Sequence, residues 1–521
     1  MIPMRWRMVR HRLPALAAAL FLVSGAFLAS AQDLASFNEK TTVHTLDNGW
    51  TFIIVERPVA PVFSFATYAN VGAAQEIPGI TGLAHMFEHM AFKGTPNIGT
   101  TNYKAEKRAI EELEAAYQAM QAERLSPQSD PERLQQLKAR FKEKEEKADE
   151  YVIKNEFGDI IDREGGTGLN AFTNSDVTGY FYSLPANKFE LMAYLESERF
   201  LHPVFREFYK ERDVVKEERR LRTESQPFGR LLEQFVSAAF MAHPYHQPVV
   251  GYMSDLNSIT ITDAEAFYRT YYVPSNLVTA VVGDIKADEI LPVIEKYFGR
   301  IPAGPAPPAL RTVEPVQIAE KTVILKDPSQ PIYAEGYHKP AATDIDEPVY
   351  NAIDDILSNG RTSRLYRSLV RDKKIAVVAQ SFSGFPGTKY PGLWIAFAIP
   401  SRGASNEEVQ AAIRDELDRL KNEDVSDAEL TRFKTRAKAD LVRSLRSNQG
   451  LANSLVRYQT QFGDWRELFR YIDRLDAVTK ADIRRVANDV FKDSNRTVGM
   501  IVTETAQGDK DEDKGSAQGE S

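Results

Sequence analysis

The stretch GLAHMFEHMAFKGT, residues Gly82–Thr95, contains two histidines and a glutamate in the pattern H-x-x-E-H. Most of its residues are good helix formers, so the stretch predicts a helix. On a helix, His85 and His89 are four residues apart and lie on one face, with Glu88 beside them. Two imidazoles one turn apart can bind a single zinc ion, and a carboxylate next to the second can reach a zinc-bound water. We therefore expect His85 and His89 to be zinc ligands and Glu88 to be a general base.

The order of these residues is the reverse of H-E-x-x-H and corresponds to the inverzincin pattern of zinc proteases. The alternative interpretation is a pair of surface or capping histidines on an amphipathic helix. The chain has only eight histidines. Chance alone should therefore produce the pattern roughly 0.02 times in a chain of this composition, which favours the zinc helix.

A catalytic zinc site usually has three protein ligands and a water, so a third ligand must come from elsewhere in the chain. The stretch ERDVVKEE offers Glu211 and Glu218, which are two helical turns apart and lie on one face. Glu217 would take the place of Glu218 if the register moved by one residue. Without the histidines, these acids would be interpreted as the exposed side of a charged helix.

The zinc-helix stretch resembles that of the pitrilysin/insulinase family of zinc metallopeptidases, which includes mitochondrial processing peptidase. The resemblance extends from about Val43 to Val502. Three further stretches match this family in the same order, namely Leu169–Ser175 (LNAFTNS), Glu211–Glu218 (ERDVVKEE) and His243–Gly251 (HPYHQPVVG). The resemblance implies a zinc endopeptidase that acts on short or unfolded peptides.

The resemblance also implies roles for particular residues. It makes Glu218 the third ligand of one zinc ion per chain and gives Glu211 the task of orienting a ligand or balancing the charge of the site. It places Asn170 and Ala171 on an edge strand that pairs with an extended peptide substrate; an ordinary strand is the alternative. The prolines beside His243 and His246 predict a packing loop there rather than a second metal site.

The predicted fold class is α+β, with two homologous domains that each contain a mixed or antiparallel sheet packed with helices. Four residues of the first half recur 219 positions later, and the proline-rich segment 301–311 predicts a linker between the halves. The zinc-binding domain is expected at 40–300 and the second domain, without metal ligands, at 312–505. Residues 506–521 are polar, which predicts a disordered tail.

Residues 101–164 are highly charged and have apolar residues at helical spacing, which predicts a helical hairpin inserted in the first domain. Ser126-Pro127 interrupts the helical pattern, and Asp130-Pro131 is suited to begin a second helix. Two interpretations remain open for this insertion. It is a solvated spacer, or it has a gating or partner-contact role.

The N-terminal residues 1–31 predict a signal peptide cleaved after Ala31, because arginines precede the apolar run Leu13–Leu28 and Ala29-Ser30-Ala31 follows it. An uncleaved anchor is the alternative, whereas cleavage would leave no stable membrane span. The chain has no cysteine and a net charge of −8. The acidic charge argues against a nucleic-acid partner. These features together predict an exported, periplasmic protein.

The second domain lacks a feature that the resemblance leads us to expect. Active members of the family have an Arg and a Tyr seven residues apart that hold the substrate and its oxyanion. Here one register offers Val370 with Val377 and the next offers Arg371 with Val378. We therefore expect a homologous partner subunit to supply the pair, with this chain as the catalytic subunit of a heterodimer. A catalytically silent structural subunit and a peptide-binding chaperone are the alternative functions.

Overall fold

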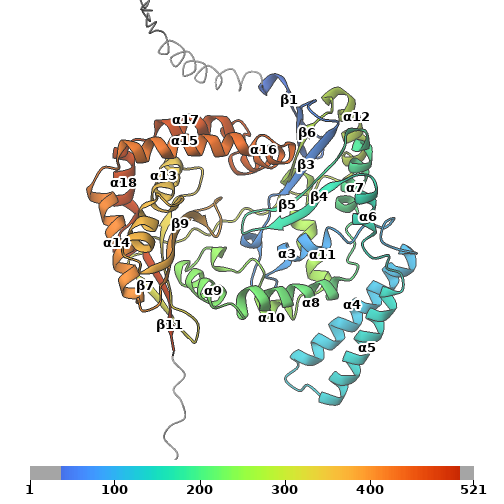
Figure 1. The fold of residues 1–521 in the computed structure, drawn as a ribbon. Coiled ribbons are helices and arrows are strands. Elements are labelled where there is room, and N and C mark those ends of the chain that lie inside the picture. Colours follow the sequence, from blue (N-terminus) through green and yellow to red (C-terminus); the bar gives the residue numbers. More distant parts are fainter. Residues whose placement is uncertain (1–36, 505–521) are drawn as a thin grey trace, which may run out of the picture.

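The computed structural model describes residues 37–504, so the predicted signal peptide and tail lie outside the described residues. The described chain folds into two halves, each built from a β-sheet and helices, which confirms the predicted α+β class with two homologous domains (Figure 1). Residues 302–320, which include most of the proline-rich segment, connect the halves without helix or strand. Nowhere between residues 37 and 504 does a helix combine the length and apolar character needed to cross a membrane.

The sheet of the first half has the strand order β1-β2-β6-β3-β5-β4. Only β2 and β6 are parallel; the other neighbours are antiparallel. Strand β4 has a partner on one side alone, so its other edge is free. The strands are β1 (Thr41–Thr45), β2 (Thr51–Glu56), β3 (Val62–Ala69), β4 (Thr167–Thr173), β5 (Thr178–Pro185) and β6 (Leu277–Gly283).

One face of this first sheet packs against helices of its own half, which include the helix predicted to bind zinc. These helices are α3 (Leu83–Met90), α6 (Glu156–Arg163), α7 (Phe189–Leu201), α8 (Phe208–Arg219), α10 (Met253–Leu256), α11 (Ile261–Tyr271) and α12 (Ala287–Phe298). The buried cluster joins strand residues such as Phe52 and Phe65 to Leu83 and Met86 of α3. The apolar side of α3, the candidate zinc helix, therefore lies in the core.

The sheet of the second half has the order β7-β11-β8-β10-β9, with β7 parallel to β11. Strand β9 is at its edge, as β4 is in the first sheet. The strands are β7 (Lys321–Asp327), β8 (Ile332–Lys339), β9 (Ala376–Phe385), β10 (Gly392–Pro400) and β11 (Arg496–Thr503). The helices are α13 (Glu347–Ser358), α14 (Asn406–Asn422), α15 (Asp427–Ser444), α16 (Asn448–Phe462), α17 (Glu467–Ala477) and α18 (Lys480–Val490).

The two halves exchange one helix each across their interface. Helix α16 of the second half packs on β3 and β6, on the face of the first sheet opposite the zinc helix. In return, helix α9 (Pro227–Ala239) of the first half packs on β7 and β11. Phe235 of α9 lies so close to the second sheet that a Cβ at Gly336 or at Gly499 would come within 2.8 Å of its ring. These contacts bury apolar surface between the halves.

The repeated residues of the two halves have the same structural role. Thr260 and Asp263 form a capping box at the start of α11, and Thr479 and Asp482 form one at the start of α18. The side-chain amides of Asn276 and Asn495 each donate to the carbonyl five residues upstream. Each also donates to a second carbonyl, that of Asn70 or of His338 respectively. The internal repeat in the sequence thus corresponds to a repeat in the structure.

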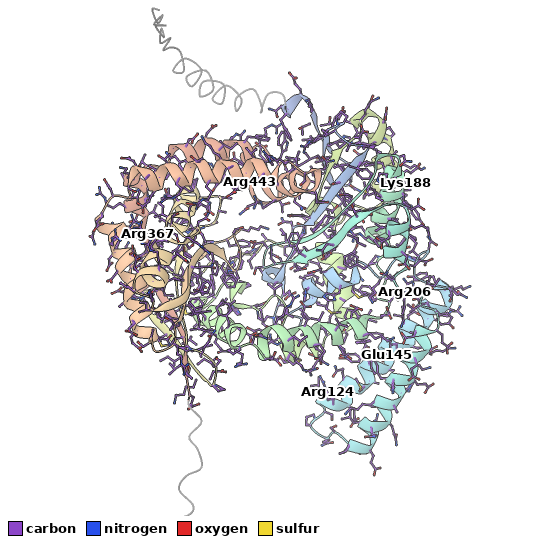
Figure 2. All side chains as sticks on the ribbon, viewed as in Figure 1. Arg124, Glu145, Lys188, Arg206, Arg367 and Arg443 are labelled. Atoms are coloured by element: carbon purple, nitrogen blue, oxygen red, sulfur yellow. The ribbon has the colours of Figure 1, made fainter. Side chains whose placement is uncertain are left out.

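Helices α4 (Tyr103–Leu125) and α5 (Pro131–Asp149) form a hairpin that projects from the first half (Figure 1). The side chains of Asn102 and Asp130 cap their first turns. The middle of α4 packs against α8 through Glu114 and Tyr117, whereas the outer surface of the hairpin carries many exposed charged side chains (Figure 2). The insertion is thus an extra helical layer on the first half.

Candidate zinc site

Gly82 is the residue immediately before helix α3, and its φ is 95°. A Cβ at this position would lie 2.9 Å from the carbonyl oxygen of Val250, so glycine suits both the backbone conformation and the packing. The buried carboxylate of Glu76 accepts hydrogen bonds from the N–H groups of Gly82 and Ala84 at 2.8 and 2.7 Å. Glu76 therefore satisfies two donors at the start of the zinc helix.

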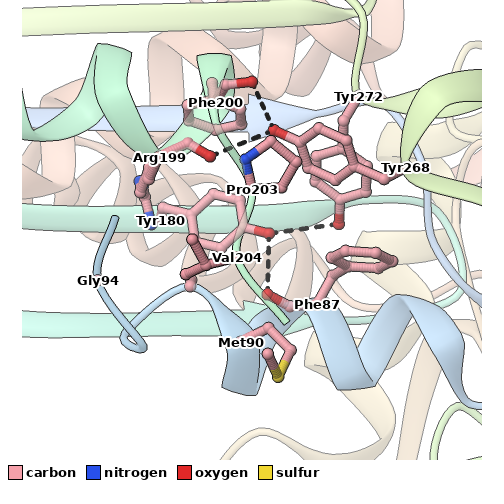
Figure 3. Close-up of a pocket in the computed structure, with 11 residues that line it drawn as sticks. Phe87, Met90, Gly94, Tyr180, Arg199, Phe200, Pro203, Val204, Tyr268 and Tyr272 are labelled. Carbon is pink, nitrogen blue, oxygen red and sulfur yellow. Dashed lines mark hydrogen bonds between the residues drawn. The ribbon is translucent and has the colours of Figure 1, made fainter. Parts of the chain in front are cut away.

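Aromatic side chains pack on the apolar side of α3, around Phe87 and Met90 (Figure 3). The hydroxyl of Tyr180 donates to the carbonyl of Phe87, and the hydroxyl of Tyr268 donates to the carbonyl of Phe200. The cavity between these rings has a volume of about 40 Å³, which is room for only a few waters. The rings around this cavity therefore support α3 on its apolar side.

His85 and His89 lie on the polar side of α3, and Glu218 approaches them from the last turn of α8. Oε2 of Glu218 is 3.6 Å from Nε2 of His85 and 3.5 Å from Nε2 of His89. In the part of the chain that the structure describes, these three side chains are the only group of His, Cys, Asp or Glu residues close enough to share an ion. The adjacent Glu217 is paired with Arg220 on the exposed side of the helix.

The three ligand atoms fit a zinc ion. With bonds of about 2.0–2.1 Å, ligand atoms of a tetrahedral zinc lie roughly 3.3 Å apart. The observed separations of 3.5 and 3.6 Å are close to this value. Two imidazole nitrogens and one carboxylate oxygen also form a common catalytic zinc set, which leaves a coordination position for water.

Glu211 is close to the second histidine but not to the first. Its Oε2 lies 3.3 Å from Nδ1 of His89, while Nε2 of His89 faces Glu218. A hydrogen bond at one ring nitrogen fixes the ring so that the other nitrogen can bind a metal. Lys93 forms ion pairs with both Glu211 and Glu207, so it holds the Glu211 carboxylate in place. Sequence reasoning missed Lys93, although it lies inside the Gly82–Thr95 stretch.

The environments of the two histidines differ. Burial and the neighbouring His89 lower the pKa of His85 to about 4, so its ring is neutral near pH 7. Burial also lowers the pKa of His89, but the hydrogen bond and negative charge of Glu211 outweigh burial and raise it. The guanidinium of Arg222 pairs with Oε1 of Glu218. A neutral His85 is ready to bind a metal.

Glu88 stands next to the ligand group without joining it. Its Oε2 lies 3.9 Å from Nε2 of His85. Burial raises the pKa of Glu88, against the lowering influence of Thr173 on β4. A carboxylate with a raised pKa next to a metal site is suited to accept and return a proton near neutral pH.

Helix α8 is fixed on its other side by the hairpin. Arg206, in the segment before α8, forms a fully buried ion pair with Glu106 of α4, in which Nη2 lies 2.8 Å from Oε2. Within α8, Arg212 donates to the Tyr117 hydroxyl and Tyr209 donates to Glu114. The hairpin therefore contacts the helix that carries Glu211 and Glu218.

Asn170 and Ala171 lie on β4, the strand with the free edge. Ala171 is buried against the core that contains α3, whereas Asn170 is exposed. His243 and His246 lie in a loop in which Nδ1 of His243 accepts from the Tyr245 N–H. Among the described residues, this loop does not contribute to any cluster of three or more possible metal ligands.

The residues in the two possible registers of the Arg/Tyr pair do not form such a pair. Val377 is exposed on β9, and Val378 comes next on the same strand. Arg371 lies in the π-helical segment Tyr366–Asp372, where its guanidinium binds the carboxylate of Asp372. A valine side chain cannot donate a hydrogen bond.

Comparisons with known proteins agree with this architecture. The sequence model described as "Insulinase (Peptidase family M16)" matches residues 51–125, and the one described as "Peptidase M16 inactive domain" matches residues 258–437. The chain is 28% identical to "Zinc protease PqqE" of Helicobacter pylori over 94% of this chain and 98% of that protein. It is 23% identical to "Probable mitochondrial-processing peptidase subunit beta, mitochondrial" of Arabidopsis thaliana over 91% of this chain and 80% of the plant protein. The crystal structure of a protease from Helicobacter pylori superimposes with a TM-score of 0.75 at 27% identity, covering 89% of this chain and 99% of that one.

Proposed function

The chain is a two-domain member of the pitrilysin/insulinase family of peptidases, and on this basis we propose that it is a zinc-dependent endopeptidase that hydrolyses short or unfolded peptides. The observation that carries the proposal is the convergence of His85, His89 and Glu218 beside Glu88. The free edge of β4 supports it, because an extended peptide can add to that edge by backbone hydrogen bonds. Asn170 and Ala171 would then lie next to the substrate.

In this mechanism His85, His89 and Glu218 would hold one zinc ion. Zinc in such a site lowers the pKa of a bound water and polarises the carbonyl of the substrate. Glu88 accepts a proton from the attacking water and later donates it to the leaving amine. Glu211 keeps the ring of His89 in the orientation that directs Nε2 to the metal.

The first experiment measures zinc content and peptide hydrolysis of the full mature chain, with and without a chelator. Glu88→Gln should retain zinc and lose roughly 10²–10⁴-fold in kcat, because it removes the proton acceptor and leaves the ligands intact. His85→Ala should lose the zinc itself. A Glu88→Gln protein that cleaves peptides at the wild-type rate would show that Glu88 is not the base. A zinc-free wild-type protein would instead favour the silent subunit or the chaperone.

We also propose that the chain is exported to the periplasm and works as the catalytic subunit of a heterodimer. Export is supported by the targeting segment at residues 1–31. The partner is supported by the valines at 377 and 378 and by the pairing of Arg371 with Asp372. Loss of one oxyanion donor typically lowers the rate by about 10²–10³-fold. Activity should therefore rise when the chain is mixed with a homologue that has the Arg/Tyr pair, and full activity of the isolated chain would contradict the partner.

A further inference from the structure

A second cavity, of about 140 Å³, lies where the two halves meet at the end of the edge strand. Phe172 of β4 and Tyr68 of β3 form one wall, and their rings pack edge to face at 5.4 Å. Helix α16 and the loop between β9 and β10 form the opposite wall. This opposite wall contributes the polar side chains of Lys389, Arg457, Thr460 and Gln461.

The cavity is on the opposite side of the first sheet from the zinc helix. Along β4, Ala171 packs in the core that contains α3, whereas the next residue, Phe172, packs in the cluster that contains α16. Side chains of a strand alternate between the two faces of a sheet, and residues opposite each other on paired strands point to the same face. A peptide paired with β4 would therefore direct every second side chain toward the α16 face and the others toward the zinc helix.

The cavity is positively charged. Arg457 is exposed and forms no ion pair within residues 37–504. Lys389 donates to Oδ1 of Asn70 at 2.6 Å, and burial lowers its pKa. Asp176 is the acid among the residues that line the cavity. Its oxygens already accept from the Tyr245 hydroxyl and from the N–H groups of Thr388 and Lys389.

Polar groups without charge add to this surface. The buried hydroxyl of Thr460 has no hydrogen-bond partner in the described part of the chain. Gln461 donates to the carbonyl and hydroxyl of Thr388, which fixes the loop of the second half against α16. The cavity thus combines an unpaired guanidinium, an ammonium and a free hydroxyl with an aromatic wall.

Resting on the proposed peptidase function, we propose that this cavity binds a carboxylate of the substrate peptide, with Arg457 as its main partner. An acidic side chain on the α16 face of the bound strand would place its methylene groups against Phe172 and Tyr68 and its carboxylate near Arg457. A guanidinium is suited to a carboxylate because it presents paired donors. The cavity then makes substrate choice depend on the second half of the chain.

The test uses internally quenched peptides that are acetylated and amidated, in which Glu or Gln is placed at successive positions. Wild type should prefer Glu over Gln by roughly tenfold in kcat/KM at one position, because hydrogen bonds to charged groups are the stronger ones. Arg457→Gln should remove this preference, and Arg457→Glu should shift it to Lys. Arg443→Gln is the matched control, since Arg443 of α15 (Figure 2) pairs with Asp440 and does not line the cavity; it should leave the preference unchanged.

Two further arms complete the design. Peptides with a free C-terminus show whether a terminal carboxylate uses the same cavity. If it does, Arg457→Gln should weaken cleavage of these peptides and leave cleavage of the amidated ones unchanged. Fluorescence anisotropy with the Glu88→Gln protein measures peptide binding without turnover. An Arg457-dependent preference in binding, with no hydrolysis by wild type, would support the cavity and contradict the peptidase. Zinc-dependent hydrolysis with equal Glu/Gln ratios in wild type and Arg457→Gln would overturn the cavity and leave the peptidase intact.

Discussion

In the first half of the chain, helix α3 packs beside the edge strand β4 and carries His85, Glu88 and His89. In the second half, helix α13 packs beside the edge strand β9. It carries Asp354 on its inner side, where the carboxylate accepts from the indole N–H of Trp394 and the hydroxyl of Ser381. The same architecture thus gathers candidate metal ligands on the helix in one half and uses a buried acid to join helix and sheet in the other.

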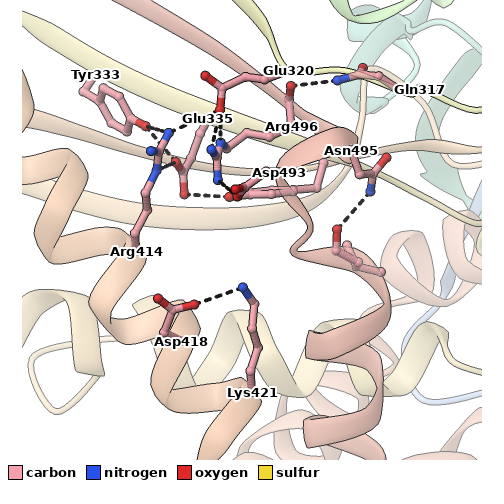
Figure 4. A network of polar contacts seen from close by, with 12 residues as sticks. Gln317, Glu320, Tyr333, Glu335, Arg414, Asp418, Lys421, Asp493, Asn495 and Arg496 are labelled. Atoms are coloured by element: carbon pink, nitrogen blue, oxygen red, sulfur yellow. Dashed lines mark hydrogen bonds and ion pairs between the residues drawn. The ribbon is translucent and has the colours of Figure 1, made fainter.

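Other polar groups of the second half are also used for packing. Glu335 is fully buried on β8 and accepts from Tyr333 and Arg414 (Figure 4). Nearby, Arg496 pairs with Glu320 and Asp493. Each of these groups has its partners within the second half. The two halves share a scaffold and differ in a few side chains, so the candidate zinc site depends on those side chains rather than on the scaffold itself.

The halves also differ in the segment that connects this helix to the edge strand. In the second half, α13 is connected to β9 by residues 359–375. In the first half, the hairpin of α4 and α5 lies in the corresponding connection. It contacts Arg206 in the segment before α8, and Tyr209 and Arg212 of α8 itself. The half that contains the candidate zinc ligands is therefore also the half with the additional support. If the halves divide their roles in this way, effects on peptide hydrolysis should decrease from the zinc ligands, through the hairpin contact, to the buried acid of α13.

The largest effect is expected at Glu218. Glu218→Gln should reduce zinc affinity by more than about 100-fold, since loss of groups that only orient a ligand already costs 10–100-fold. Glu217→Gln is the matched control, because Glu217 is exposed and pairs with Arg220. Zinc content after dialysis against a weak chelator measures both. The reverse result, with zinc lost in Glu217→Gln and kept in Glu218→Gln, would mean that the register of the third ligand is wrong.

A smaller effect is expected when the contact between hairpin and first half is broken. Glu106→Gln leaves the buried Arg206 without its carboxylate, which should lower the free energy of unfolding by about 3 kcal/mol and weaken hydrolysis through the displaced α8. Urea denaturation monitored by circular dichroism measures the loss. Glu146→Gln serves as the control, since Glu146 and its partner Lys142 are exposed on α5. Equal stability of the two variants would show that the hairpin does not support α8.

The local features of the site could be predicted from the sequence, because two histidines and a glutamate within five residues have a fixed geometry on a helix. Glu218 is different. It is far from His89 in sequence, and spacing alone left it open against Glu211 and Glu217. Only the family resemblance selected it, and the structure places its carboxylate 3.5 Å from His89.

Several contacts could not be predicted, because they join distant segments whose sequences show no periodic pattern. Glu76 at the start of α3, Arg206 with Glu106, and the packing of α16 on the first sheet are examples. Burial of a charged residue such as Arg206 has no signal in a single sequence, since most arginines are exposed. The internal repeat was visible because four residues recur at a constant offset of 219. That the threonine and aspartate of each copy form a capping box is shown by the structure.

The smallest effect on hydrolysis is expected at Asp354, and it is the sharpest test of the comparison. Burial raises the pKa of Asp354 from 3.8 to about 7. An acid whose pKa is higher in the folded state binds more protons there than in the unfolded state between these two values. The free energy of unfolding contributed by this group therefore falls as pH rises from about 4 to about 7. Asp354→Asn removes the titration. The wild type should therefore lose free energy of unfolding relative to the variant as pH rises through this range. Zinc content and kcat/KM should not change, because Asp354 contacts Trp394 and Ser381 rather than the zinc site. Urea midpoints at a series of pH values measure the first effect and peptide hydrolysis the second. A loss of zinc or of activity in Asp354→Asn would show that the second half takes part in the chemistry through this helix, and the division of roles between the halves would not hold.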